Sequence, residues 1–223
     1  MFITFEGGEG SGKTSVIKAI SSLLTEKNID HVTTREPGGS IIAEKIRKVI
    51  LDTENTNLSA EAEALLFAAS RVQHLEEVIL PALNENKIVL CDRYLDSSLA
   101  YQGYARGLGI EDVLKINHYA AKSLPDYTIY IDVTPELGLK RVSTRGAANR
   151  LDLETLEFHK KVREGYLKLA EMYKDRYIII DGDCDLETLI ERTLKKIKAV
   201  LAWKMKESKT NSIFSNKPLK IIV

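Results

Sequence analysis

The chain has 223 residues, and its 32 basic and 32 acidic side chains leave no formal net charge. This balance argues against broad capture of nucleic acid or of an anionic membrane surface. The two cysteines, Cys91 and Cys184, have neither a metal-like spacing nor a disulfide framework, which predicts a reduced, cytoplasmic protein. The N-terminus lacks the pattern of a signal peptide, and no long apolar run predicts a membrane span.

The first predicted element is a buried strand at 2–6. It leads directly into Gly-Gly-Glu-Gly-Ser-Gly-Lys-Thr at 7–14, the full pattern of a phosphate-binding loop, and a helical pattern follows. In such a loop the backbone N–H groups turn toward phosphates, Lys13 charges the β and γ oxygens, and Thr14 holds Mg²⁺. A chance glycine-rich turn is the alternative, but the flanking strand and helix favour nucleotide binding. The predicted ATP-binding residues are Gly7, Gly8, Glu9, Gly10, Ser11, Gly12, Lys13 and Thr14.

Strands and helices alternate along the rest of the chain. The period of the side chains and the turn residues between segments predict strands at 30–34, 87–91, 127–132 and 177–181. Ser59 and Asp185 are expected to cap the helices that follow them, and Pro81 to kink or end the first of these. This order predicts an α/β fold of the P-loop NTPase type, with a five-stranded parallel sheet flanked by helices in a single domain at 1–203. Residues 204–223 are interpreted as a basic C-terminal tail.

Charged residues follow two of the predicted strands. Ligands of open parallel sheets bind beyond the carboxyl ends of the strands. Asp92 stands where P-loop proteins place the carboxylate that orients Mg²⁺ or its waters, although an Asp there is also a common turn or helix cap. Arg35 and Arg93 are suited to hold a second phosphate, with surface salt bridges as the alternative. Two phosphate sites at one edge predict transfer between them.

Glu9 lies inside the phosphate loop, where a nucleotide would repel its charge. Its side chain is therefore expected to point away, toward the acceptor, where it would take a sugar hydroxyl. On the residues alone, a solvated loop carboxylate is an equal alternative.

The helix after Ser59 separates its apolar residues into two groups. At about 100° per residue, Leu65 and Ala69 share one face, while Phe67 and Arg71 point to nearly the opposite one. Phe67 is therefore predicted not to be an ordinary core residue. Its spacing from Arg71 suits an aromatic ring that stacks on a base beside a guanidinium that donates to the base edge. An aromatic and a cation on an exposed or dimer-facing surface are the alternative.

The segment at about 141–152 carries Arg141, Arg145 and Arg150 around a turn of small residues. It is interpreted as a lid, in which Arg145 or Arg150 would spread the charge of a phosphoryl group in transfer and exclude water. A solvated loop with salt bridges is the alternative.

Four motifs extend these patterns: FEGGEGSGKT at 5–14, TREPGG at 34–39, LFAASR at 66–71 and DRYLDSSLAYQG at 92–103. Together they closely resemble bacterial thymidylate kinases, P-loop nucleoside monophosphate kinases, over about residues 1–201. The resemblance implies a cytoplasmic homodimer that transfers the γ-phosphoryl group of ATP to dTMP with Mg²⁺, giving dTDP and ADP for dTTP synthesis. Some members of the family carry a basic residue in the phosphate loop and others carry it in the lid. With Glu9 in the loop and Arg145 and Arg150 in the lid, this chain is similar to the second, bacterial type.

The resemblance also implies residue roles. Arg35 and Arg93 would hold the acceptor phosphate, with Arg47 as a further arginine on that side. Phe67 would stack on thymine, and Arg71 and Gln102 would bond its edge. The implied substrate-binding residues are Arg35, Glu36, Pro37, Arg47, Phe67, Arg71, Arg93, Ser97, Ser98, Tyr101 and Gln102. The candidate catalytic residues are Glu9, Lys13, Asp92, Arg93, Arg145 and Arg150. The candidate Mg²⁺ ligands are Thr14 and Asp92, directly or through a water molecule.

Two other functions compete with this one. A kinase for another nucleoside monophosphate shares the loop and lid but should lack the set of Phe67, Arg71 and Gln102. A P-loop switch or motor that hydrolyses its nucleotide needs a guanine-reading or water-positioning signature, which the sequence does not contain.

Overall fold

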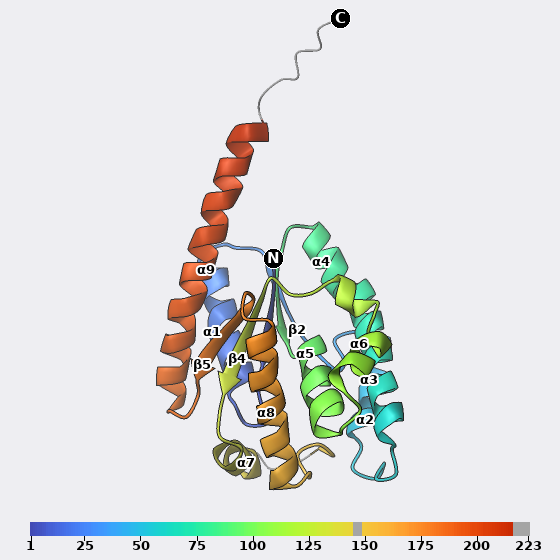
Figure 1. Cartoon of the computed structure of the whole chain (residues 1–223). Helices are drawn as coiled ribbons and strands as arrows, with labels where there is room; N and C mark the ends of the chain where they lie inside the picture. The colour runs from blue at the N-terminus through green and yellow to red at the C-terminus, as the bar shows by residue number, and fades with distance from the viewer. Residues whose placement is uncertain (145–148, 216–223) are drawn as a thin grey trace, which may run out of the picture.

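The computed structural model describes residues 1–144 and 149–215, with side chains up to residue 201. The strands in these ranges are β1 (Phe2–Glu6), β2 (His31–Arg35), β3 (Ile88–Asp92), β4 (Tyr127–Asp132) and β5 (Tyr177–Asp181). The helices are α1 (Lys13–Glu26), α2 (Ile41–Leu51), α3 (Ala60–His74), the π-helical η1 (Leu75–Ile79), α4 (Leu80–Asn84), α5 (Leu95–Ser98), the π-helical η2 (Leu99–Ala105), α6 (Ile110–Ile116), the 3₁₀ turn η3 (Ala120–Lys122), α7 (Pro135–Ser143), α8 (Leu156–Met172) and α9 (Leu186–Ser215). Figure 1 shows their arrangement.

The described strands form one parallel sheet in the order β2-β3-β1-β4-β5. This confirms the predicted fold class. β2 and β3 each begin and end one residue later than the sequence predicts, because Arg35 and Asp92 still pair with each other. The parallel ladder therefore brings an arginine and a carboxylate together at the carboxyl edge of the sheet.

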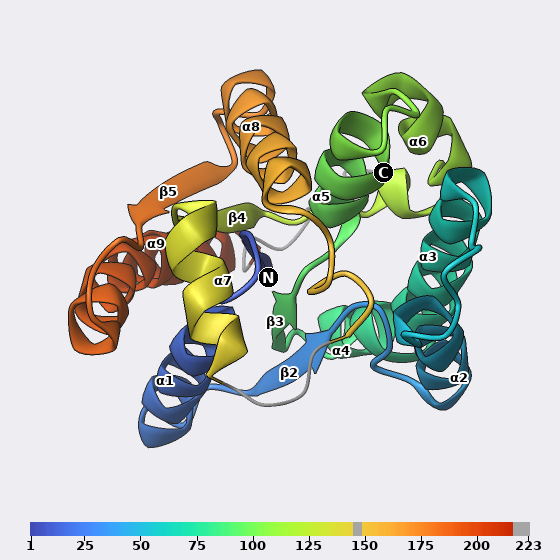
Figure 2. The same ribbon diagram turned by 90° about the horizontal axis from the view of Figure 1, so that it is seen from below.

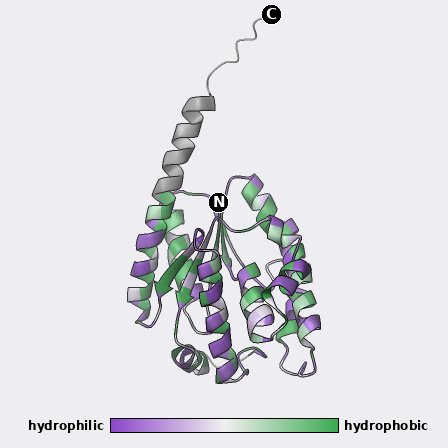
Figure 3. Ribbon diagram, in the orientation of Figure 1, coloured by the Kyte–Doolittle hydropathy of each residue, from purple (hydrophilic) through white to green (hydrophobic). Residues whose placement is uncertain are grey.

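Helices cover both faces of the sheet (Figure 2). The strand residues alternate between two cores, so that Phe2 of β1 packs with α3, α5 and α8, while Ile3 and Phe5 pack with α1 and α9. Figure 3 shows the sheet as mainly hydrophobic between helices of mixed character. Burial on both faces explains why the central strands β1, β3 and β4 are largely apolar.

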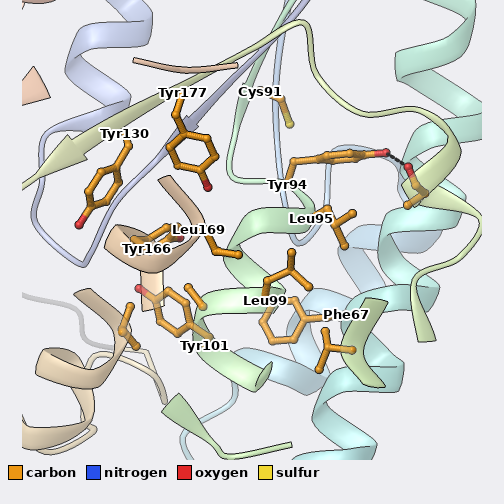
Figure 4. Packing of buried hydrophobic residues seen from close by; sticks show 14 of the residues in the cluster. Phe67, Cys91, Tyr94, Leu95, Leu99, Tyr101, Tyr130, Tyr166, Leu169 and Tyr177 are labelled. Carbon is orange, nitrogen blue, oxygen red and sulfur yellow. Dashed lines mark hydrogen bonds between the residues drawn. The ribbon is translucent and has the colours of Figure 1, made fainter. Parts of the chain in front are cut away.

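The core on the α3 side contains a cluster of aromatic side chains (Figure 4). Tyr130 stacks on Tyr166 at a ring distance of 5.1 Å, and Tyr101 meets the edge of Tyr166 at 6.2 Å. Phe67 belongs to the same core, whereas Leu65 is 57% exposed. Phe67 also lines a cavity at the edge of the sheet, so it is more than a core residue, but the face of α3 that holds Leu65 is not the buried one. Apolar periodicity misplaced the buried face because that face is largely polar, with Glu63, Ser70, Arg71 and His74.

Two predicted helix caps are confirmed. The Ser59 hydroxyl accepts from the N–H of Ala62 at 3.2 Å, and the Asp185 carboxylate accepts from the N–H of Thr188 at 2.9 Å. Pro81 does not end its helix. The π-helical turn η1 precedes it, and α4 continues to Asn84 with Pro81 in its first turn, where a missing N–H is tolerated.

α9 continues across the expected boundary at residue 204, so a separate tail at 204–223 stays a prediction. Within residues 1–144 and 149–215, no helix is both long and apolar enough to cross a bilayer.

Candidate active site

A cavity of about 640 Å³ opens at the carboxyl edge of the sheet. Its walls come from the phosphate loop, the segments after β2 and β3, α3, η2 and the described ends of the lid segment. The predicted residues that line it are Glu9, Gly10, Ser11, Gly12, Lys13, Thr14, Arg35, Glu36, Pro37, Arg47, Phe67, Asp92, Arg93, Ser97, Tyr101 and Gln102. The fold thus gathers most of the predicted site at one place.

The phosphate loop wraps around the Lys13 ammonium group. Lys13 Nζ donates to the carbonyl oxygens of Gly7 and Gly8 at 3.1 and 3.0 Å, and to Ser11 Oγ at 3.1 Å. Burial, and then the charge of Arg93, lowers the pKa of Lys13 to about 8. Gly7 and Gly8 therefore act through their carbonyls behind the cavity wall, while Lys13 itself lines the cavity. These loop contacts place the Lys13 ammonium group at the cavity wall, where it could exchange them for hydrogen bonds to a phosphate.

Thr14 and Asp92 form the candidate metal site. Thr14 Oγ1 donates to Asp92 Oδ2 at 3.0 Å, although the two residues are 78 positions apart in the chain. Mg²⁺ prefers oxygen ligands and is usually held by one or two protein oxygens together with substrate phosphates. A hydroxyl and a carboxylate this close, beside the phosphate loop, fit that ion.

Arg93 connects the phosphate loop to the part of the cavity that Ser97 lines. Its φ of 69° lies in the left-handed region, uncommon for a residue other than glycine, and directs the side chain back across the loop. Its guanidinium donates to the carbonyl of Gly7 at 3.0 Å and to Glu9 Oε1 at 2.7 Å. Strained backbone of this kind is typical of functional sites.

Glu9 points toward Arg93 and Tyr101. Its Oε1 accepts from Arg93 and, at 2.9 Å, from the hydroxyl of Tyr101. Burial alone would disfavour the charged form, but the charge of Arg93, and then that of Lys13, lowers the pKa of Glu9 to about 2. Glu9 is therefore a buried, ionised partner of Arg93 rather than a solvated loop carboxylate.

Arg35, at the end of β2, and Arg47, in α2, also line the cavity. Arg35 pairs with Glu44 at 2.9 Å and is 54% exposed, so it is the most accessible of the three arginines. Arg47 donates to the carbonyl of Pro37 at 2.6 Å. Burial, and then the charge of Arg35, lowers the pKa of Arg47. These like charges share one cavity with Arg93, which favours an anion between them.

Arg71 lies behind the cavity wall. It is 1% exposed, and its guanidinium donates to Glu36 Oε2 at 2.7 Å, to Asn117 Oδ1 at 2.6 Å and to the carbonyl of Tyr94 at 3.1 Å. His74 Nδ1 lies 3.0 Å from the other oxygen of Glu36. Arg71 therefore fixes the segment after β2, and a direct bond from Arg71 to a base stays a prediction.

The polar residues after β3 differ in their access to the cavity. Ser97 lines it, and the Ser97 hydroxyl donates to the buried carboxylate of Glu6 at 2.6 Å. Ser98 is buried but does not line the cavity. Tyr101 and Gln102 lie in η2, a π-helical turn of the kind often found at functional sites.

Of the predicted lid segment, Arg141, Val142, Asn149 and Leu151 line the cavity. Arg145 lies outside the described residues, and Arg150 does not line the cavity. The Arg150 guanidinium donates to Glu63 Oε2 at 2.5 Å and to the carbonyl of Ile50 at 2.9 Å. In this structure Arg150 is therefore bound to α3, and its predicted contact with a moving phosphoryl group requires this bond to exchange.

Sequence reasoning assigned no individual role to six lining residues: Arg141, Val142, Asn149 and Leu151 lie within the predicted lid segment, whereas Ser15 and Leu51 were missed. Arg141 ends near the phosphate loop, 3.5 Å from the carbonyl of Gly10 and 2.7 Å from that of Cys184. Glu63, which binds Arg150, was also missed, because an acidic residue in the first turn of a helix needs no ligand to explain it. No local pattern links these residues across the chain.

The fold and the site define a P-loop nucleotide-binding protein with a second, arginine-rich anion site. A family model for thymidylate kinase matches residues 5–193, so the chain belongs to the thymidylate kinase family. It is 54% identical over 199 residues to the thymidylate kinase of Acholeplasma laidlawii (strain PG-8A), covering 88% of this chain and 98% of that protein.

Two further comparisons agree. The thymidylate kinase of Clostridium novyi (strain NT) is 54% identical over 193 residues, covering 85% of this chain and 94% of that protein. A crystal structure of thymidylate kinase from Ehrlichia chaffeensis superposes with a TM-score of 0.73 at 32% identity, covering 89% of this chain and 98% of that one.

Proposed function

We propose that this protein transfers the γ-phosphoryl group of ATP to dTMP, giving dTDP and ADP. One observation carries the proposal most directly. A phosphate loop with its lysine and three arginines suited to a second phosphate line the same cavity of about 640 Å³. Phosphoryl transfer needs no covalent group from the enzyme, because positioning and charge neutralisation supply the rate. Two anion sites in one cavity meet that need.

On the donor side, the loop N–H groups and Lys13 bind the triphosphate. Lys13 exchanges its bonds with the carbonyls of Gly7 and Gly8 for bonds to phosphate oxygens. Thr14 and Asp92 would hold Mg²⁺, which supplies charge neutralisation and orientation of the phosphates when bound.

On the acceptor side, Arg35, Arg47 and Arg93 bind the phosphate of dTMP. Paired hydrogen bonds from a guanidinium group to a phosphate are stronger than hydrogen bonds from neutral donors. As Arg93 turns its donors to this phosphate, the Glu9 carboxylate keeps its bond from Tyr101. Tyr101 packs under the sugar and leaves no room for a ribose 2′-hydroxyl, which makes the site selective for deoxynucleotides.

The base lies between Phe67 and Gln102 at the far end of the cavity. Phe67 stacks on thymine, and Gln102 bonds its edge. Arg71 supports this end through Glu36 and stays a candidate for a bond to the thymine O4. Arg145 and Arg150 close over the phosphates and stabilise the charge that develops during transfer.

The proposal includes a homodimer. The packed pair α2 and α3 exposes large apolar side chains, including Ile41, Ile42, Val49 and Leu65, which a second copy would cover. Light scattering on the purified protein should give twice the mass of the 25.0 kDa chain. A single-chain mass at micromolar concentration would contradict this part. The proposal also places the protein in the cytoplasm, supported by the free thiols of Cys91 and Cys184.

A coupled assay of ADP release with and without dTMP tests the activity. ADP release should depend on dTMP, and other monophosphates should replace it poorly. Equal release without an acceptor would favour a hydrolysing P-loop protein, and better use of another monophosphate would favour a related kinase.

A further inference from the structure

Gln102 is held from behind by Glu63 of α3. Gln102 Nε2 donates to Glu63 Oε1 at 2.9 Å, and both side chains are 1% exposed. Gln102 also lines the cavity. Its own Oε1 is buried and has no hydrogen-bond partner among the described residues. A buried carbonyl without a partner is costly, so this oxygen, together with the second hydrogen of Nε2, remains for a ligand.

The carboxylate of Glu63 fixes which way the amide points. An ionised carboxylate only accepts hydrogen bonds, whereas an amide has one accepting end and one donating end. Gln102 must therefore turn Nε2 toward Glu63. The reversed amide would set two oxygens against each other in a buried place, which is strongly unfavourable. Glu63 thereby decides which end of Gln102 faces the cavity.

Other residues hold Glu63 in this state. Its Oε2 accepts from Arg150 at 2.5 Å and from Arg106 at 3.2 Å. Burial opposes ionisation of Glu63, but bonds from Arg106 and then from Gln102 lower its pKa. Arg106 is fixed in turn by Glu154 at 2.5 Å. Arg106 keeps its bonds to the carboxylate when Arg150 exchanges its own, so Glu63 stays charged and remains an acceptor for the amide.

The orientation matters because pyrimidines differ at the edge that Gln102 faces. Thymine and uracil carry a donor at N3 and an acceptor at O4, whereas cytosine carries an acceptor at N3 and a donor amino group at C4. The observed orientation would let Oε1 accept from N3–H and the second hydrogen of Nε2 donate to O4. A reversed amide would match cytosine at both positions. One flip of this side chain thus exchanges the complementary base.

We propose that Glu63 is a specificity-determining positioning residue, which selects an N3–H pyrimidine over cytosine by locking the Gln102 amide. This inference rests on the proposed dTMP kinase function, and it assigns the discrimination to a residue that does not line the cavity. Glu63 acts through Gln102 and does not touch the substrate.

The test compares kcat/KM for dTMP and for dCMP in Glu63→Gln and in a matched control, Glu154→Gln. A glutamine at 63 pairs with either orientation of Gln102, so the dTMP-to-dCMP ratio should fall by about 10-fold or more. The control removes one carboxylate from the same cluster without contacting Gln102, and its ratio should equal that of the wild type. For each variant, kcat/KM for dTMP and kcat/KM for dCMP are measured on the same enzyme preparation, so a partly unfolded fraction cancels in the ratio.

A double variant separates positioning from a general structural effect. In a Gln102→Ala background, adding Glu63→Gln should leave the ratio unchanged, because the amide it orients is gone. An unchanged ratio in the single variant, or an equal fall in the control, would overturn the inference.

Two measurements on the wild type complete the test. The first measurement is used if Glu63→Gln does not fold. Wild-type enzyme should bind dTMP methylated at N3 at least about 10-fold more weakly than dTMP, and equal binding would overturn the inference. Wild-type enzyme without dTMP-dependent activity would refute the proposed function itself. Activity with dTMP but no change of ratio in Glu63→Gln would refute the positioning role alone.

Discussion

Replacing Arg71 with Met should destabilise the ligand-free protein strongly. Arg71 is 1% exposed and makes three hydrogen bonds of 2.6 to 3.1 Å, one of them to the Glu36 carboxylate, which is 2% exposed. Removing one partner of a buried ion pair typically costs about 3–5 kcal/mol, because the other charge stays buried without compensation. His74 keeps its bond to Glu36, so we expect about 3 kcal/mol.

Urea unfolding at equilibrium measures this loss without any substrate. Arg35→Met is the matched control, because Arg35 pairs with Glu44 but is 54% exposed, and such pairs contribute about 0–1 kcal/mol. Adding Glu36→Gln to Arg71→Met should recover about 1–3 kcal/mol, since the unpaired charge is removed. A loss below about 1 kcal/mol for Arg71→Met would refute the reasoning and leave base recognition as the main role of Arg71.

Lys13→Ala should lose most activity in the dTMP-dependent assay while its melting temperature stays near that of the wild type, and unchanged turnover would remove the phosphate-loop assignment. Among acceptors, dCMP and UMP should be poor and dUMP intermediate, about 1–3 kcal/mol behind dTMP in kcat/KM, whereas equal use of dCMP and dTMP would contradict the assigned base edge. Arg150→Ala should lower kcat by about 10²-fold with little change in dTMP affinity, and Arg145→Ala similarly if both arginines close over the phosphates. Wild-type kcat in both single variants and in the double variant would show that the lid arginines are not catalytic.

The sequence predicts the central strands well because β1, β3 and β4 are buried on both faces and therefore largely apolar, as β3 is at Ile88–Cys91, whereas the edge strand β2 is only partly buried. The phosphate loop and the ends of β2 and β3 are equally predictable, because each is a short continuous segment of the sequence. The order of parallel strands then brings Thr14 to within 3.0 Å of Asp92.

The sequence does not predict that the buried face of α3 is polar. Hydrophobic periodicity assumes that buried positions are apolar, yet α3 buries Glu63, Arg71 and His74 against polar partners from distant segments. Each contact joins residues far apart in the chain, as in the bond from Arg150 to Glu63 across 87 positions. Such networks depend on tertiary packing, so only the fold can reveal them.

The central claim is that the phosphate loop and the arginine site exchange one phosphoryl group. It is tested most directly by incubating the protein with ATP labelled at the γ-phosphate, together with dTMP and Mg²⁺, and separating the products. The account predicts that the label appears in dTDP and that Lys13→Ala abolishes its transfer. Label released only as inorganic phosphate, at the same rate with and without dTMP, would contradict the account.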